Sequence, residues 1–348
     1  MRLHKLLLLM VVAILSSCSN DDDVAAPVVP SGDYANGFFV LNEGGIGEVT
    51  FASNDFNTVT QDIFAAVNGT ETDLGAYVQS MFFDGERAFV ISNGSNKITV
   101  VNRYTFEYIA TISTGFTVPR YGVVSNGKAY VTNSNSFTSD TDDFITVIDL
   151  SNLTVTATIP VDDQAEKLVA FDGKLYVSGG FYGMGNKIIV VNTASNQIST
   201  KITVADAPNS LQIGGGTLHV LSSGFDAPST LTRINLNDNS ILETVNFPST
   251  MNGAQNLVFD DNQLFFNVNS KIYKFPSNVA TITDAAIATV SSTSAYIGYG
   301  FAVHNNKIYI SEGADDFASD GKAFVYDFNG NLVKSFATGL GPNGFYFN

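Results

Sequence analysis

One short motif recurs along this chain: a turn built from Asn, Asp or Gly, followed by a strand of aromatic and β-branched residues. It reads NGFFVLNEGG from Asn36, DGERAFVISNG from Asp84, NGKAYVTNS from Asn126, DGKLYVSGG from Asp172 and NNKIYISEG from Asn305. Related turns at Gly215 and Asn262 bring the units to seven, spaced 42 to 48 residues apart. Repeats of this length are typical of solenoids and propellers, so they constrain the fold more than any single residue does.

Each unit holds enough sequence for four strands and shows no helical periodicity. An apolar segment such as SMFFD or KLVAF precedes each turn, and two further strands follow, as in NKITVVN and QISTKITV. Asx-Gly pairs supply the positive φ that tight hairpins need. A four-stranded sheet must stack on neighbours to bury both faces. The pattern therefore predicts an all-β, seven-bladed β-propeller.

The two ends of the repeat region complement each other. The region opens with NGFFVLNEGG, which has no preceding inner strand, and it ends with GPNGFYFN, which resembles an inner strand without the rest of its blade. We expect the strand around Gly344 to Phe347 to pair with the strand around Phe38 to Leu41. The N- and C-terminal strands would then share one blade and close the ring.

The first residues differ in character from the repeats. A basic start that ends at Lys5 precedes an apolar run from Leu6 to Leu15, and small residues lead to a lone cysteine, Cys18, in the string LSSC. This order is typical of a bacterial lipoprotein signal. The run is shorter than the about 20 residues that a membrane-spanning helix needs. We therefore expect acylation of Cys18, and with one cysteine no intrachain disulfide can form.

These patterns predict three segments. Residues 1–17 are the expected signal peptide, residues 18–33 an acidic and flexible lipidated tether, and residues 34–348 the propeller. The chain carries 17 basic and 33 acidic residues, which gives a net charge of −16. This charge argues against nucleic acid and against an anionic membrane surface as partners.

A binding site is expected where the repeats differ. In a propeller, the loops after the second strand of each blade share one face with the first residues of the inner strands. The inner strands place there Gln79, Arg120, Tyr121, Asn209, Gln255, Tyr299 and Asn343. The loops add the apolar residues Phe137, Phe181, Tyr182, Met184, Phe225 and Phe317. Aromatic faces beside amide and guanidinium groups predict a concave site for a flat, polar-edged ligand or a sugar. The alternative is that the loop aromatics only pack on neighbouring blades.

Catalytic patterns are weak. Outside the first segment the histidines are His219, which takes a strand position held elsewhere by tyrosine, and His304, which borders a turn. No HExxH or GxSxG motif occurs, and the glycine-rich strings lie between strands. The acids near Asp143 and Asp316 lack the spacing of a calcium loop, so we expect solvated loops there. We predict a non-enzyme without a metal or cofactor.

A family resemblance adds to these inferences. The strings GFFVLNEGG, DLGAYVQSMFFDGERAFVISNGSNKITVVN, PRYGVVSNGKAYVTNS and APNSLQIG resemble the YncE-type propeller lipoproteins of Bacteroidetes, and SNDDD after Cys18 resembles their surface-export signal. Within that family the chain is most similar to the surface group that captures cobalamin for a TonB-dependent transporter. The resemblance implies a corrinoid on the loop-bearing face and a lipid anchor on the outer face of the outer membrane.

Functions of different classes therefore compete. The first is a non-catalytic capture lipoprotein for a corrinoid, with a glycan as the alternative ligand and a TonB-dependent transporter as the partner. The second is a propeller whose loop-bearing face docks another surface protein. An enzyme comes third, because the necessary acid and base residues are not evident.

Overall fold

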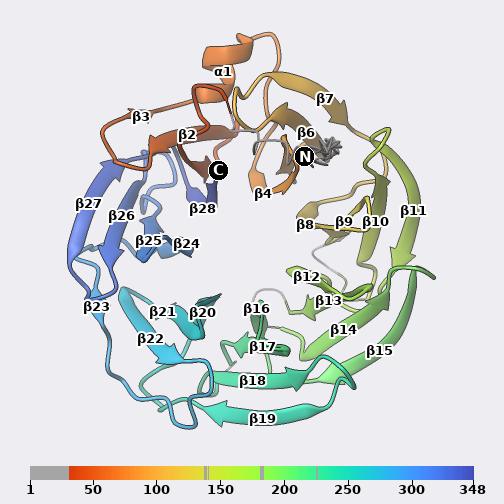
Figure 1. Ribbon diagram of the computed structural model, residues 1–348, viewed down its shortest axis with the longest axis vertical. Coiled ribbons are helices and arrows are strands. Elements are labelled where there is room, and N and C mark those ends of the chain that lie inside the picture. Colours follow the sequence, from red (N-terminus) through yellow and green to blue (C-terminus); the bar gives the residue numbers. More distant parts are fainter. Residues whose placement is uncertain (1–30, 137–138, 140, 181–183, 225) are drawn as a thin grey trace, which may run out of the picture. The chain divides into compact units, whose positions relative to one another are not determined.

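The computed structural model describes residues 31–136, 139, 141–180, 184–224 and 226–348. Seven four-stranded antiparallel sheets surround a central channel (Figure 1). The predicted seven-bladed propeller is therefore confirmed. Among the described residues, no helix has the length and apolar character required to cross a membrane.

Each blade runs from an inner strand at the channel to an outer strand at the rim. The inner strands are β4 (Val78–Asp84), β8 (Pro119–Ser125), β12 (Leu168–Phe171), β16 (Pro208–Gly214), β20 (Ala254–Asp260), β24 (Ile297–His304) and β28 (Pro342–Phe347). The second strands are β5 (Arg87–Ser92), β9 (Lys128–Asn133), β13 (Lys174–Gly179), β17 (Thr217–Ser222), β21 (Gln263–Val268), β25 (Lys307–Glu312) and β1 (Gly37–Asn42).

The third and outer strands complete each sheet in the same blade order. The third strands are β6 (Lys97–Asn102), β10 (Phe144–Asp149), β14 (Lys187–Asn192), β18 (Thr230–Asn235), β22 (Lys271–Pro276), β26 (Lys322–Asp327) and β2 (Glu48–Ser53). The outer strands are β7 (Tyr108–Ile112), β11 (Thr154–Pro160), β15 (Gln197–Thr203), β19 (Ile241–Asn246), β23 (Ala288–Thr289), β27 (Leu332–Ala337) and β3 (Val59–Thr60).

The ring closes as predicted, through strands from opposite ends of the chain. β28 pairs antiparallel with β1, with Phe38 opposite Phe347 and Leu41 opposite Gly344. The Asn348 amide N–H donates to Gly37 O at 3.1 Å, which continues the pairing beyond the strand. One blade is therefore assembled from both ends of the repeat region.

Tight turns join each inner strand to its second strand. In the turn between β8 and β9, Asn126 and Gly127 have φ of 52° and 72°, the left-handed values that the Asx-Gly signal predicts. Two turns lie one residue later than the repeat suggests: Gly85 with Glu86, and Gly215 with Gly216. The repeat therefore located the hairpins to within one residue.

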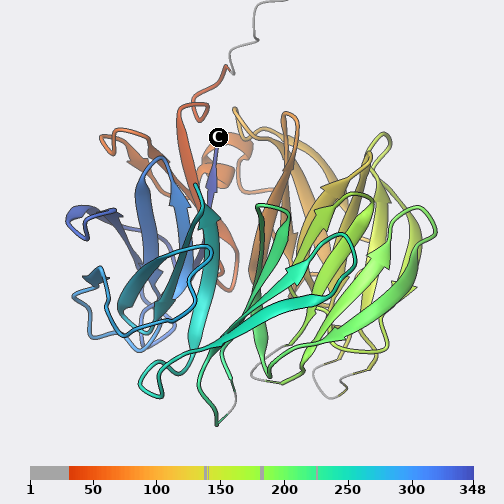
Figure 2. The ribbon, with the colours of Figure 1, turned by 60° about the horizontal axis from the view of Figure 1, so that its bottom comes forward.

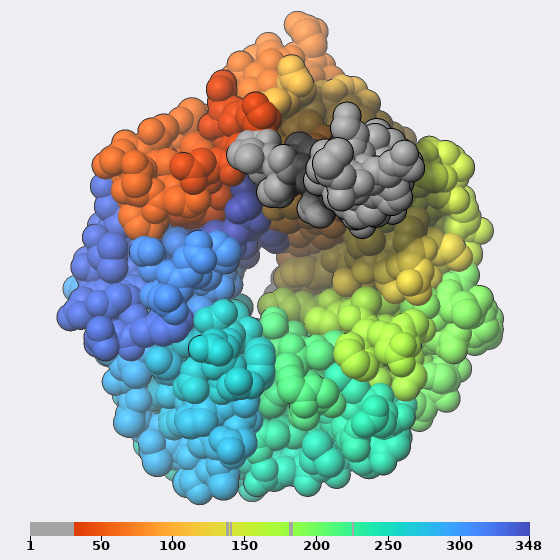
Figure 3. All heavy atoms as spheres, in the orientation of Figure 1, coloured from red at the N-terminus to blue at the C-terminus, as the bar shows by residue number. Residues whose placement is uncertain are grey.

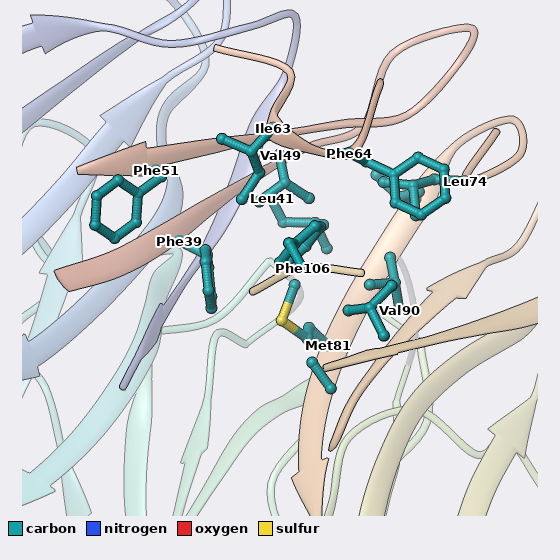
Figure 4. Packing of buried hydrophobic residues seen from close by; sticks show 13 residues of the cluster. Phe39, Leu41, Val49, Phe51, Ile63, Phe64, Leu74, Met81, Val90 and Phe106 are labelled. Carbon is teal, nitrogen blue, oxygen red and sulfur yellow. The ribbon is translucent and has the colours of Figure 1, made fainter. Parts of the chain in front are cut away.

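The core lies between neighbouring sheets. Figure 4 shows one such cluster, in which Phe39 and Leu41 of β1 pack with Met81 of β4 and Val90 of β5. Second strands are almost wholly buried, whereas the outer strand β11 alternates between exposed and half-buried residues. The sheets also approach closely, because a Cβ added to Gly122 would lie 2.4 Å from the ring of Phe82.

The sequence shows no helical periodicity, but the structure contains one short helix. The helix α1 (Ile63–Asn68) lies between β3 and β4 at the rim of the ring (Figure 1). The Asp62 carboxylate accepts a hydrogen bond from Ala65 N at 3.3 Å, and Ile63 and Phe64 are buried. Six residues are too few to leave a clear helical period in the sequence.

The strands run between two faces of the ring. The turn face carries the hairpins between inner and second strands and also the closing residue Asn348. The loop face carries the connections from second to third strands and from each outer strand to the next inner strand. In Figure 2 the C end marks the turn face, above the loop face. Figure 3 shows the channel as an opening at the centre of the turn face.

Candidate ligand site at the channel mouth

Two adjoining cavities open where the inner strands begin, at the loop face. The side cavity, about 620 Å³, is lined by the closing blade, the next two blades and Tyr299 of the preceding blade. The central cavity, about 450 Å³, extends into the channel. Both are lined by Tyr121, Tyr299 and Asn343. Volumes of this size suit a small organic ligand or part of a larger one.

The structure brings most of the predicted residues together. Gln79, Arg120, Tyr121, Gln255, Tyr299 and Asn343 each line at least one of the two cavities. Asn209 occupies the corresponding place on β16 but lines neither cavity. The predicted loop residues Phe181, Tyr182 and Phe225 lie outside the described residues, as does Phe137.

Arg120 is fixed by a buried ion pair. Its Nε and one terminal nitrogen donate to the two carboxylate oxygens of Glu166, at 2.9 and 2.7 Å. Its other terminal nitrogen donates to Gln79 Oε1 at 2.6 Å. Both ion-pair partners are about nine-tenths buried, with 8% of each residue exposed. The two-point contact with Glu166 joins two blades and matches the charge of Arg120 with a carboxylate, and the bond to Gln79 adds a third neighbouring blade.

This ion pair sets the direction of a hydrogen-bond chain. Because a guanidinium only donates, the Gln79 oxygen must face Arg120, and the Gln79 amide nitrogen donates to the Tyr121 hydroxyl oxygen at 3.1 Å. Asn93 also donates to the Gln79 oxygen, at 2.9 Å. Burial and the nearby Glu166 carboxylate raise the pKa of Tyr121 above its usual range. Tyr121 therefore remains a neutral phenol that can donate its proton.

Several amides at the mouth join one blade to the next. Asn343 Nδ2 donates to Val78 O at 2.8 Å, and Asn209 Nδ2 donates to Ala254 O at 2.8 Å. Gln255 Nε2 makes a longer contact of 3.4 Å with Gly298 O. These N–H groups therefore support the inner ring. The same amides were predicted to contact a ligand, so they would serve both the ring and the site.

Aromatic groups flank the amides. The Tyr299 hydroxyl donates to a Glu43 carboxylate oxygen, and both residues line the side cavity. Tyr296, which lines the central cavity, packs edge-on against Phe317 with ring centroids 4.3 Å apart. Phe317 is 53% exposed, so the pair presents an apolar surface beside the mouth. An uncharged aromatic wall of this kind can stack on a flat ligand or a sugar ring.

Sequence reasoning missed Glu166 and Lys167. Counted back from the inner hairpin, Glu166 occupies the place that Arg120 and Gln255 hold in their blades, and Lys167 the place of Tyr121. The repeat was the signal that could have found them. The string KLVAF, which begins at Lys167, was interpreted only as an apolar inner strand, and the two residues at its start were not included among those of the channel mouth. Asn256 and Tyr346, which line the central cavity, were missed as well.

The remaining candidate groups serve the fold. His219 is buried against Phe259, with ring centroids 5.5 Å apart, and burial lowers its pKa to about 4. His304 stacks on Phe347 at the turn face. Asp143 was expected in a solvated loop, but it is buried. Its carboxylate accepts a hydrogen bond from Ala165 N at 2.7 Å. Within the described ranges no cluster of three or more His, Cys, Asp or Glu could hold a metal ion.

Comparison with known families identifies the family of this chain. Residues 36–348 match the family model described as a domain of unknown function, DUF5074. The chain belongs to the DUF5074 family. No curated protein matches its sequence.

Solved structures share the fold of this DUF5074 chain. The computationally designed Ika8 protein is 13% identical, with a TM-score of 0.57 over 92% of this chain and 93% of that chain. BamB from Moraxella catarrhalis is 11% identical, with a TM-score of 0.55 over 88% and 84%. Apo AztD from Citrobacter koseri is 11% identical, with a TM-score of 0.54 over 89% and 96%. At these identities the likeness concerns the propeller fold alone.

Proposed function

We propose that this chain is a non-catalytic, ligand-binding propeller that captures a flat, polar-edged organic molecule at its channel mouth. The observation that carries the proposal is the pair of adjoining cavities, in which Tyr121 and Tyr299 stand beside the amides of Gln79, Gln255 and Asn343. Aromatic faces bury apolar ligand surface, and amides fixed between blades select its polar edge.

The ligand we propose is a corrinoid. A corrinoid combines a broad ring with a rim of amides, so it suits a surface that spans both cavities and Tyr121, which lines both. Apolar burial contributes on the order of 25 cal/mol per Å², before the cost of ordering the ligand. Because Gln79 and Asn343 are already held by bonds within the ring, little side-chain entropy is lost on binding.

The place of capture is part of the proposal. The lipoprotein-like start of the sequence supports an acyl anchor at Cys18 and a position on the outer face of the outer membrane. A TonB-dependent transporter is the partner we propose for delivery. Replacing Cys18 by Ala should move the protein from the membrane to soluble fractions, and protease added to intact cells should reach the propeller. A protected propeller would contradict the surface location.

Calorimetry with cyanocobalamin tests the ligand. We expect saturable binding that Tyr299→Ala weakens by about 1–3 kcal/mol, because truncation removes a central aromatic contact. Tyr108→Ala is the matched control, since Tyr108 is 42% exposed on the outer strand β7, away from the channel. Absence of heat with cyanocobalamin, in a protein with an unchanged melting temperature, would overturn the corrinoid proposal.

A glycan is the second candidate ligand. The exposed pair of Tyr296 and Phe317 favours it, because aromatic faces beside amides also suit sugar rings. A glycan panel titrated in the same way should then give saturable binding that Phe317→Ala weakens. If neither cyanocobalamin nor any glycan binds, the loop face is better explained as a docking surface for another protein.

A further inference from the structure

The central cavity has an unusual charge. Of its described lining residues only Lys167 is charged, although the whole chain carries a net charge of −16. The other lining residues are amides, aromatic rings, small residues and aliphatic groups. An acidic protein therefore presents one isolated cation inside a cavity at its channel mouth.

The charge of Lys167 is not matched by a carboxylate. Within the described chain, no acid lies within 4.0 Å of its Nζ, whereas the adjacent Glu166 gives both oxygens to Arg120. Lys167 Nζ lies 5.6 Å from the centre of the Tyr121 ring, a weak cation–π contact. Burial lowers the pKa of Lys167, and the nearby Arg120 adds to this effect, whereas the Glu166 carboxylate opposes it. Lys167 therefore presents its ammonium to the cavity while the adjacent carboxylate is used by Arg120.

A second donor faces the same cavity. The Tyr121 oxygen already accepts from Gln79, and no described residue accepts the Tyr121 proton. The Arg120 guanidinium polarises the Gln79 amide, and this amide in turn polarises the Tyr121 hydroxyl, because each group donates to the next oxygen. Lys167 and Tyr121 thus offer a cation and an oriented neutral donor to one space.

We propose that the central cavity is an anion subsite, which takes a carboxylate or phosphate group of the captured ligand between Lys167 and the Tyr121 hydroxyl. The inference rests on the proposed ligand-binding function and narrows it to ligands that carry an anionic group. Gln255 adds a further donor, since only one of its two amide hydrogens has a partner among the described residues. A charge-assisted contact of this kind is stronger than a neutral hydrogen bond.

The subsite should depend on pH in one direction. Lys167 binds an anion only as an ammonium, and burial holds its pKa below the ordinary lysine value. Anion affinity should therefore be greatest below the pKa of Lys167 and fall as pH rises through it. An arginine at this place would stay charged and keep its affinity at high pH.

Sulfate is a suitable probe, because its own charge does not change in this range. Sodium sulfate would be titrated calorimetrically into the purified chain at constant ionic strength, near pH 7 and near pH 10, about the ordinary lysine pKa. We expect saturable binding near pH 7. The affinity for sulfate should fall about tenfold in Lys167→Met and severalfold in Tyr121→Phe. Lys167→Arg should bind equally at both pH values, whereas the wild type should weaken at the higher pH.

The matched control is Lys128→Met, which removes a lysine from a turn-face hairpin. Unchanged sulfate binding in Lys167→Met, or an equal loss in Lys128→Met, would overturn the subsite. If Lys167→Met fails to fold, Lys167→Arg still decides, because loss of the pH dependence is expected only if Lys167 holds the anion.

The two proposals can fail separately. Binding of cyanocobalamin or a glycan that Lys167→Met leaves unchanged would retain ligand capture and refute the anion subsite. Sulfate binding that depends on Lys167, without binding of either organic ligand, would retain the subsite and refute the proposed ligands.

Discussion

The two faces of the ring are built by the same seven units but in different ways. On the turn face, inner and second strands are joined by two-residue turns, as between Ser125 and Lys128 or between Phe171 and Lys174. On the loop face, the connections from second to third strands range from two residues after Val268 to ten after Asn133. The turn face is therefore regular from blade to blade, whereas the loop face varies between blades and can form a specific site.

Hydrogen bonds connect neighbouring blades at both faces, and at the turn face they join two blades at a time, as Arg87 does when it donates to Leu150 O at 2.8 Å. A turn-face hairpin such as Asn126 and Gly127 lies within one blade. At the loop face, Gln79, Arg120 and Glu166 belong to three successive blades and form one network. We expect changes in such a hairpin turn to act locally and changes in the loop-face network to affect several blades.

The largest effect should come from opening the ring. Deleting residues 340–348 removes β28 and exposes the hydrogen-bonding edge of β1, so the protein should aggregate. Size-exclusion chromatography and thermal melting measure the outcome. Replacing residues 314–320 of a loop-face connection by Gly and Ser is the control, and it should leave a monomer. A truncated protein that is monomeric with an unchanged melting temperature would refute closure by β28.

The next largest effect should come from the buried ion pair. Arg120→Met leaves Glu166 charged, buried and without its partner, which should lower the free energy of unfolding by about 3–5 kcal/mol. Urea unfolding of Arg120→Met, Glu166→Met and the double variant measures the coupling. The double variant should regain much of the loss, because no uncompensated charge remains. Additive losses would show that the pair does not act as a unit.

The sequence predicts the features that each unit repeats, but not the contacts that form between blades. The repeat predicted seven blades, and the incomplete strings at each end predicted the pairing of Phe38 with the Phe347 strand. Both depend on local patterns that each unit repeats. The hydrogen-bond chain from Glu166 to Tyr121 was not predicted, because its members are 45 or so residues apart and only blade stacking brings them together.

The site was predicted in part for the same reason. The register of the inner strands located Gln79, Arg120 and Tyr121 at the mouth without any structure. That register does not say which amides are used within the ring, as Asn343 is, or which charge lacks a partner, as that of Lys167 does. Those properties depend on distances between side chains of different blades.

The loop face should also give a smaller, pH-dependent effect through Asp143. Burial raises the pKa of Asp143 to about 7, above the ordinary carboxyl value of 3.8. A folded-state pKa that is raised stabilises the fold at low pH, and this contribution is lost as pH rises from about 4 to about 7. Asp143→Asn should therefore gain stability relative to the wild type as pH rises from about 4 to about 7, by no more than about 4 kcal/mol. Unfolding curves measured from pH 4 to pH 8 that stay parallel for the two proteins would contradict the prediction.

The smallest effect should come from the turn face, and it tests whether that face is modular. Gly127 and Gly173 have φ of 72° and 71°, and a Cβ added at either meets no atom closer than 3.8 Å. Alanine there should cost only the backbone strain of the left-handed region, about 1 kcal/mol at each site. Since the two turns belong to separate blades, the double variant Gly127→Ala with Gly173→Ala should lose about the sum of the two single losses. A coupling as large as that expected for Arg120 and Glu166 would remove the distinction between the faces, because turns in different blades would then depend on each other.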